Sequence, residues 1–235
     1  MKSADRPAAD PIVAALARVR VRIDAACARS GRDPNGVRLV AVSKTKPASD
    51  IVRAADAGQT IFGENRVQEA LIKKAEVDRV VDWHLIGALQ RNKSRHAVGA
   101  FALLHGIGDE KLLAEIDRRA EAAGIRQAVL LQVRLGDEAS KSGVDPAGLP
   151  ALVDTAAGMP NIDLRGLMTI PPPVERADQA RPWFRRLRRL RDVETGRTGI
   201  ALSELSMGMT GDFEVAVEEG ATLVRVGTAI FGARN

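Results

Sequence analysis

The segment Val37–Lys44 reads VRLVAVSK, a short run of apolar and β-branched residues that ends in a lysine. Continuous apolar runs of this length are typical of strands that are buried on both faces of a parallel sheet. Similar runs recur along the whole 235-residue chain and predict eight strands. These are Arg38–Ser43, Thr60–Gly63, Asp82–Ile86, Ala100–Gly106, Ala128–Arg134, Leu164–Thr169, Glu204–Met207 and Leu223–Val226.

Amphipathic stretches separate the predicted strands and carry helix start and stop signals. The first spans about Pro11–Arg29, where Asp10 can cap the amino end and Gly31 follows the carboxyl end. Further helix starts are predicted at Asp109, Asp145–Pro146 and Asp212. Alternating strands and helices build βαβ units with right-handed crossovers. The pattern therefore favours an α/β fold, a single (β/α)8 TIM barrel with an extra N-terminal helix, while an open doubly wound sheet is the alternative.

Composition and cysteine content narrow the class of protein. Hydrophobic residues make up 45% and charged residues 28% of the chain, enough for one sizeable core. No window approaches the ~18 consecutive apolar residues of a membrane span. Residues 1–10 are polar, lack the core of a signal peptide and are expected to be flexible, so the barrel domain is assigned to 11–235. The single cysteine, Cys27, excludes an internal disulfide and favours a cytoplasmic protein; Cys27 itself is interpreted as a core residue.

A formal net charge of +5 requires that nucleic-acid binding be considered. The densest basic run, RPWFRRLRRLR at Arg181–Arg191, has apolar residues at helical spacing, which places its arginines on one face of an amphipathic helix. We interpret that face as solvated. Aromatic residues make up only 3% of the chain, which argues against a surface for stacking bases. Nucleic-acid binding is therefore disfavoured.

The lysine at the end of the first strand suggests carbonyl chemistry. In a parallel barrel the reactive groups lie at the carboxyl ends of the strands. Partial burial of Lys44 there would disfavour the ammonium form and lower its pKa, and a neutral amine is what condensation with a carbonyl requires. The alternative is that Lys44 merely begins a solvated loop, as Lys46 is expected to do.

Small residues follow the last two strands and predict an anion site. The segment Ser206–Gly211 reads SMGMTG, and Gly227-Thr228 follows the eighth strand. Small residues let backbone N–H groups approach an anion, hydroxyl groups add donors, and barrels commonly hold phosphate after these two strands. A lysine facing a phosphate site fits a phosphorylated aldehyde, for which pyridoxal 5′-phosphate (PLP) is the leading candidate.

Three further polar residues lie at strand ends. Asn65 follows the second strand, and His84 lies in the third, although a lone histidine is more often structural. Arg225 precedes the phosphate site and could reach the pyridine nitrogen of PLP. Because an arginine does not readily share its proton, that nitrogen would stay unprotonated and the ring would be a poor electron sink. No metal site is expected.

Several segments in this order resemble the pyridoxal phosphate homeostasis proteins, also called the proline synthetase co-transcribed family. They are LVAVSKTKP (Leu39–Pro47), FGENRVQE (Phe62–Glu69), WHLIGALQRNK (Trp83–Lys93), SKSGV (Ser140–Val144), RGLMTIPP (Arg165–Pro172), LSMGMTGDFEVAV (Leu205–Val217) and VRVGTAIFGAR (Val224–Arg234). The resemblance covers nearly the whole chain. The chain departs from the family pattern at three positions: Ala88, where proline is usual, Arg66, where an aromatic residue is usual, and Thr210, where serine is usual.

The resemblance implies a barrel like the N-terminal domain of bacterial alanine racemase, with PLP held as a Schiff base on Lys44. It implies that Ser206, Gly227 and Thr228 hold the phosphate and that Arg225 faces the pyridine nitrogen. By the same resemblance, Asn65, His84 and Met207 line the pocket. Family members are thought to buffer the cofactor or deliver it to PLP-dependent apo-enzymes, without catalytic turnover.

The competing hypothesis is a PLP-dependent enzyme such as an amino-acid racemase. Related racemases use a tyrosine from an added β domain as the second acid/base, whereas this chain has no tyrosine. We expect no added domain beyond Asn235, although another residue could serve as the base. The sequence therefore favours a monomeric PLP-binding protein over an enzyme.

Overall fold

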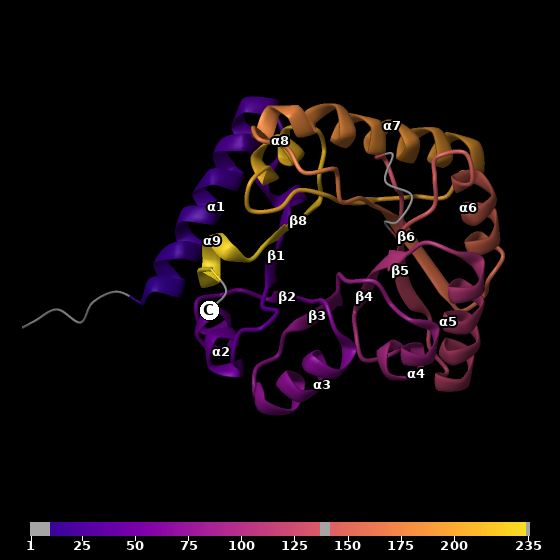
Figure 1. The fold of residues 1–235 in the computed structure, drawn as a ribbon, viewed down its shortest axis with the longest axis horizontal. Coiled ribbons are helices and arrows are strands. Elements are labelled where there is room, and N and C mark those ends of the chain that lie inside the picture. The colour runs from indigo at the N-terminus through magenta and orange to yellow at the C-terminus, as the bar shows by residue number, and fades with distance from the viewer. Residues whose placement is uncertain (1–9, 137–141, 234–235) are drawn as a thin grey trace, which may run out of the picture.

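Eight parallel strands close into a barrel in chain order in the computed structural model, which describes residues 10–136 and 142–233 (Figure 1). The strands are β1 (Arg38–Val42), β2 (Ile61–Glu64), β3 (Asp82–Leu85), β4 (Leu103–Ile107), β5 (Gln127–Gln132), β6 (Ile162–Met168), β7 (Glu204–Ser206) and β8 (Leu223–Val226). Pairing of β1 with β8, which sets Val40 opposite Arg225, closes the barrel. The prediction of a (β/α)8 barrel is confirmed, and the open sheet is excluded.

Helices form a ring around the strands, as Figure 1 shows. They are α1 (Pro11–Ser30), α2 (Ala48–Asp56), α3 (Val67–Glu76), α4 (Ser94–Ala97), α5 (Glu110–Ala123), α6 (Leu149–Ala157), α7 (Arg181–Thr198), α8 (Phe213–Glu218) and α9 (Thr228–Phe231), with 3-10 turns at Pro34–Gly36, Arg91–Lys93 and Ala177–Ala180. In the parts of the chain that are described, no helix is long and apolar enough to cross a bilayer.

The extra N-terminal helix forms where the capping residues predicted it. The Oδ1 atom of Asp10 accepts a hydrogen bond from the backbone of Ile12 at 2.8 Å, and Gly31 ends α1 in the left-handed conformation. This helix packs against α2, α8 and α9 and so covers the seam between β8 and β1. Apart from Asp10, the segment expected to be flexible lies outside the described residues. Cys27 is buried in the core, as interpreted.

Alternation along the strands sorts side chains between the inside and the outside of the barrel. A small apolar cluster fills the interior: Val40, Val42, Ile61, Ile86, Leu103, Leu130, Met168 and Leu223. The larger cluster joins the outer faces of the strands to the helices. Because successive strand residues point to opposite faces, Arg225 shares the inner face with Leu223, whereas Val224 and Val226 belong to the outer cluster.

Three predictions about elements need correction. The strand expected at Ala100 begins at Leu103, because the backbone N–H of Ala100 is still bonded to the turn that ends α4. The helix predicted to open at Asp145 begins at Leu149, because the Asp145 carboxylate instead accepts from the backbone of Gly148 and closes a turn.

The arginine face of α7 is only partly solvated, which is the third correction. Arg181 and Arg185 donate to the carboxylate of Glu219 at 3.1 and 2.9 Å. Arg181 also pairs with Glu218 at 2.7 Å. Part of the basic run therefore joins α7 to α8 rather than facing solvent alone.

Candidate functional site

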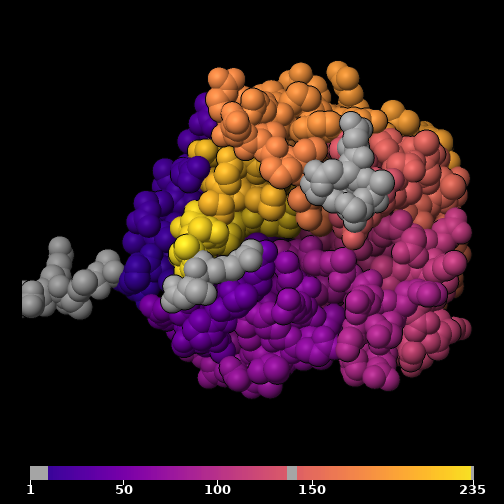
Figure 2. Space-filling view, viewed as in Figure 1, coloured from indigo at the N-terminus to yellow at the C-terminus, as the bar shows by residue number. Residues whose placement is uncertain are grey.

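A cavity of about 320 Å³ lies at the carboxyl end of the barrel, near β1, β2 and β8. Its lining contains Val42, Lys44, Lys46, Asn65, Ile86, Ile170, Met209, Thr210, Gly211, Arg225, Gly227, Thr228, Phe231 and Gly232. Figure 2 shows the gold and yellow segments of the C-terminal part on one side of a hollowed face, with the violet segment that follows β1 opposite them. The volume is that of a site for a small molecule.

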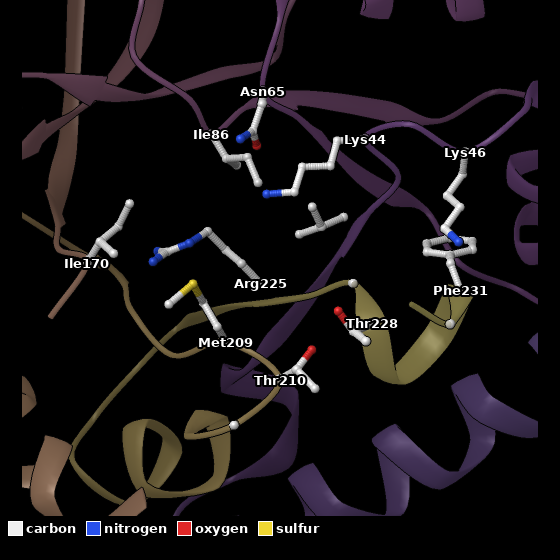
Figure 3. A pocket seen from close by; sticks show the side chains of 14 residues that line it. Lys44, Lys46, Asn65, Ile86, Ile170, Met209, Thr210, Arg225, Thr228 and Phe231 are labelled. Carbon is white, nitrogen blue, oxygen red and sulfur yellow. The ribbon is translucent and has the colours of Figure 1, made fainter. Parts of the chain in front are cut away.

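Lys44 lies two residues beyond the end of β1, after Ser43, and is half-buried. Its amine extends into the cavity between Asn65 and Arg225 (Figure 3). The β1–β2 pairing aligns Val42 with Gly63, so Lys44 and Asn65 leave adjacent strands at the same height. The registration of parallel strands therefore places an amine and an amide together at the rim of the barrel.

Two threonines supply hydroxyl groups on the opposite side of the cavity. Thr210 lies in the loop after β7 and Thr228 at the start of α9, and both hydroxyls point into the same space (Figure 3). Gly211 and Gly227 line the cavity beside them. Hydroxyl and backbone donors gathered on small residues are suited to an anion such as phosphate.

Gly208 allows the loop that carries Thr210 to fold back on the barrel. Its φ is 91°, a conformation that side chains rarely adopt, and a Cβ atom there would lie 2.5 Å from that of Ala216. Asp212 then accepts from the backbone N–H of Met209 at 2.6 Å, which closes the turn. Asp212 thus serves this turn, while no side-chain hydrogen bond from it caps α8.

Arg225 is the buried cation of the site. Only 3% of its surface is exposed, and it donates to the Ser206 hydroxyl at 2.5 Å and to the backbone carbonyl of Thr169 at 2.9 Å. Burial lowers the pKa of Arg225 to about 10, with the charge of Asp212 opposing the shift, so the guanidinium stays protonated at neutral pH. With five N–H donors, it can hold both partners and still present donors to the cavity.

A chain of hydrogen bonds continues from Arg225 into the barrel. Ser206 contacts the Nδ1 atom of His105 at 2.8 Å, and the Nε2 atom of His105 contacts Nδ1 of His84 at 3.0 Å. Burial lowers the pKa of His84 to about 4. Burial, repulsion from His84 when that ring is protonated, and the charge of Arg225 hold the pKa of His105 well below its usual range. Both rings are therefore neutral near pH 7 and fix Ser206 beneath Arg225.

The structure brings five of the eight predicted site residues into one cavity: Lys44, Asn65, Arg225, Gly227 and Thr228. Ser206 and His84 point into the barrel but lie below the cavity, where they support Arg225 rather than line the wall. Met207 is fully buried in the outer cluster, because the residue after the inward-facing Ser206 must point away from the barrel axis. The expectation that Met207 lines the pocket does not match this placement.

Sequence reasoning missed several lining residues and one buried residue. Thr210 belongs to the predicted anion segment Ser206–Gly211 but was not singled out as a binding residue, because it lies in a loop beyond the end of β7, where strand alternation no longer applies. His105 lies in an otherwise apolar strand, and an inward-facing histidine there was the available signal. The apolar wall formed by Ile86, Ile170 and Phe231 comes from three separate elements, so no local pattern could group its members. Within the described residues, no cluster of three His, Cys, Asp or Glu side chains could hold a metal ion.

Comparison with known proteins identifies the family of the chain. The family model for the N-terminal domain of alanine racemase matches residues 15–235. The pyridoxal phosphate homeostasis protein of Aquifex aeolicus is 46% identical over 221 residues, covering 94% of this chain and 97% of that protein. The protein of the same name from Escherichia coli K12 is 41% identical over 229 residues, covering 94% and 95%.

Solved structures show the same relationship. PipY of Synechococcus elongatus, solved with PLP bound, is 39% identical, has a TM-score of 0.84, and is matched over 94% of this chain and all of that one. Alanine racemase of Clostridium difficile has a TM-score of 0.68 at 12% identity, with 92% of this chain matching 56% of the racemase, so that similarity concerns the fold alone. The chain therefore belongs to the family of pyridoxal phosphate homeostasis proteins, built on the alanine racemase N-terminal fold.

Proposed function

We propose that the protein binds PLP as a Schiff base on Lys44 and acts in PLP homeostasis rather than in catalytic turnover. The observation that carries the proposal is a single cavity that combines the Lys44 amine, the hydroxyls of Thr210 and Thr228, and the buried guanidinium of Arg225. The named relatives support it, because PipY was solved with PLP and the curated relatives are called PLP homeostasis proteins.

The donor set fits the chemistry of PLP. A phosphate group needs several hydrogen-bond donors, which Thr210, Thr228 and the backbone at Gly227 can provide. The cofactor supplies an aldehyde that condenses with an amine, and Lys44 presents an amine across the cavity. Arg225 would donate toward the pyridine nitrogen and Asn65 toward a ring oxygen. Ile86 and Ile170 give the apolar surface on which a ring can pack.

The absence of a suitable second acid/base supports binding over catalysis. Among the cavity-lining residues that the structure describes, none is a histidine, carboxylate or cysteine, and the sequence has no tyrosine. Lys46 is the other lysine that lines the cavity. Its amine donates a hydrogen bond to the backbone carbonyl of Ala233 at 3.0 Å, so it is engaged with the backbone. Because Arg225 remains protonated, it would leave the ring nitrogen of bound PLP unprotonated and the ring a poor electron sink.

A turnover assay separates this proposal from the racemase alternative. Purified protein loaded with PLP is incubated with single enantiomers of the common amino acids, and chirality and keto-acid products are measured. The Lys44→Ala variant is the control for cofactor-independent background. We expect no conversion above that control; sustained racemisation or transamination by the wild-type protein would overturn the homeostasis role and favour an enzyme.

We propose a monomeric cytoplasmic protein whose PLP-binding unit spans 11–235 and which delivers cofactor to PLP-dependent apo-enzymes. Activation of an apo-enzyme faster by loaded protein than by an equal amount of free PLP would support delivery, and equal rates would contradict it. Size-exclusion chromatography with light scattering tests whether the protein is a monomer in solution.

Nucleic acid is not a proposed partner. The arginines at the amino end of α7 already pair with Glu218 and Glu219, which reduces the charge that the helix offers to phosphates. A gel-shift assay at low salt, where phosphate contacts are strongest, should show no complex.

A further inference from the structure

The backbone on both sides of Lys44 is held by one charged cluster. On one side, the carbonyl oxygen of Ser43 accepts from the Lys73 amine at 2.8 Å, and the Ser43 hydroxyl donates to the Glu64 carboxylate at 2.7 Å. On the other side, the backbone N–H of Thr45 donates to the Glu69 carboxylate at 2.5 Å. The residues before and after Lys44 are therefore bound to three side chains from β2 and α3.

The same three side chains are bound to one another. The Lys73 amine lies 2.8 Å from Glu64 and 2.7 Å from Glu69. Glu64 is fully buried and Lys73 almost so, whereas the Glu69 side chain is 25% exposed. Paired charges in a buried setting hold their geometry because breaking one contact leaves an uncompensated charge. The cluster can thus act as a fixed support behind β1.

Thr45 shows that this support imposes a conformation. Its φ of 64° makes it the one residue other than glycine with positive φ in the described parts of the chain. A β-branched residue in this region is uncommon and carries a steric cost. The chain therefore turns sharply directly after Lys44, at the residue whose N–H is bound by Glu69. A local cost of this kind persists only where surrounding contacts determine it.

We propose that Glu69, together with Lys73 and Glu64, positions Lys44 for coupling to PLP by holding Ser43 and Thr45 in place. The inference rests on the proposed function, because it concerns the same Schiff base. None of the three side chains lines the cavity, so they act through Lys44 rather than on the cofactor. Orienting a nucleophile in advance speeds a reaction, because the entropy of its free rotation is then not lost on reaching the transition state.

Substitutions of Glu69 test this positioning role. Glu69→Ala removes the acceptor of the Thr45 N–H, while Lys73 keeps Glu64 and Ser43 as partners. Glu69→Gln keeps an acceptor of the same length. Glu69→Asp keeps the charge but is one methylene too short to hold both Thr45 and Lys73. Glu76→Ala is the matched control, because Glu76 lies exposed at the last residue of the same helix.

The measurement is the rate of Schiff-base absorbance after PLP is added to cofactor-free protein, together with a urea unfolding curve for each variant. We expect Glu69→Ala to slow coupling about tenfold, by loss of orientation. We expect Glu69→Asp to slow it several-fold, and Glu69→Gln and Glu76→Ala to stay within about twofold of wild type. Recovery in the Gln variant but not in the Asp variant is a pattern that loss of stability alone would not give.

Coupling at the wild-type rate in folded Glu69→Ala would overturn the inference. If that variant does not fold, the comparison of Glu69→Asp with Glu69→Gln decides, and equal rates in these two would overturn it as well. A wild-type protein that forms no adduct at Lys44 is a different result, since it contradicts the proposed function itself.

Discussion

Lowering the pH from 7 to 5 should destabilise the protein through the two buried histidines of the barrel. His84 and His105 contact each other at 3.0 Å, and burial lowers the pKa of both. In the unfolded chain each imidazole takes up a proton near its ordinary pKa of about 6.5. The unfolded state therefore binds more protons below that pH, and stability is lost as the pH falls toward the folded-state pKa.

The size of the effect follows from the folded-state pKa of about 4 for His84, which is 4% exposed. Linkage with an unfolded pKa of 6.5 gives a loss of about 2 kcal/mol for this residue between pH 7 and pH 5. His105 contributes in the same direction. A loss of ~2 kcal/mol is a large share of the stability of a typical domain, and it moves a urea midpoint by roughly 1 M.

Urea unfolding at pH 7 and pH 5 measures the effect directly. His84→Gln keeps hydrogen-bonding capacity but does not titrate, so its stability should fall less than that of wild type over the same interval, by about 2 kcal/mol. His96→Gln, at an exposed position, is the control and should follow wild type. A wild-type protein with equal stability at both pH values, or a His84→Gln variant with the wild-type slope, would refute the reasoning.

Three further substitutions test the site. Gly208→Ala should lower the free energy of unfolding by roughly 2–5 kcal/mol, because a left-handed backbone costs ~1–2 kcal/mol and the contact of the new Cβ with Ala216 adds a packing cost. A urea midpoint equal to that of wild type would contradict this. Thr210→Val should weaken PLP binding roughly tenfold to a hundredfold, since it removes a hydrogen bond to a charged group worth ~1.5–3 kcal/mol; absorbance titration measures it, and unchanged affinity would remove Thr210 from the phosphate site. Arg225→Glu should raise protonation of the ring nitrogen and shift the absorbance of bound PLP, and an unchanged spectrum in folded protein would mean that Arg225 does not face that nitrogen.

Much of the fold was predictable because its signals are local. Several of the buried strands are continuous apolar runs, and the capping residues Asp10 and Asp109 lie where α1 and α5 begin. The errors arose where one residue type serves two local structures. Asp145 can cap a helix or close a turn, and only the neighbouring backbone decides between them.

The site was less predictable because it depends on the register between strands that are distant in the sequence and on how deep in the barrel each side chain lies. Motif position placed Lys44 and Arg225 correctly at the mouth of the barrel, but not Met207, which faces outward. The contact of Ser206 with His105 joins residues 101 positions apart, and no spacing rule anticipates it. The contact of the charged cluster with Thr45 requires a positive φ at that residue, and nothing about a threonine in the sequence predicts a positive φ.

The most direct test of the account is the mass of a single peptide. Protein loaded with PLP is reduced with borohydride, digested, and searched for the modified lysine. The account predicts that the adduct is on the peptide containing Lys44 and is lost in Lys44→Ala. An adduct on Lys46 or on any other lysine, or no adduct at all, would contradict the assignment.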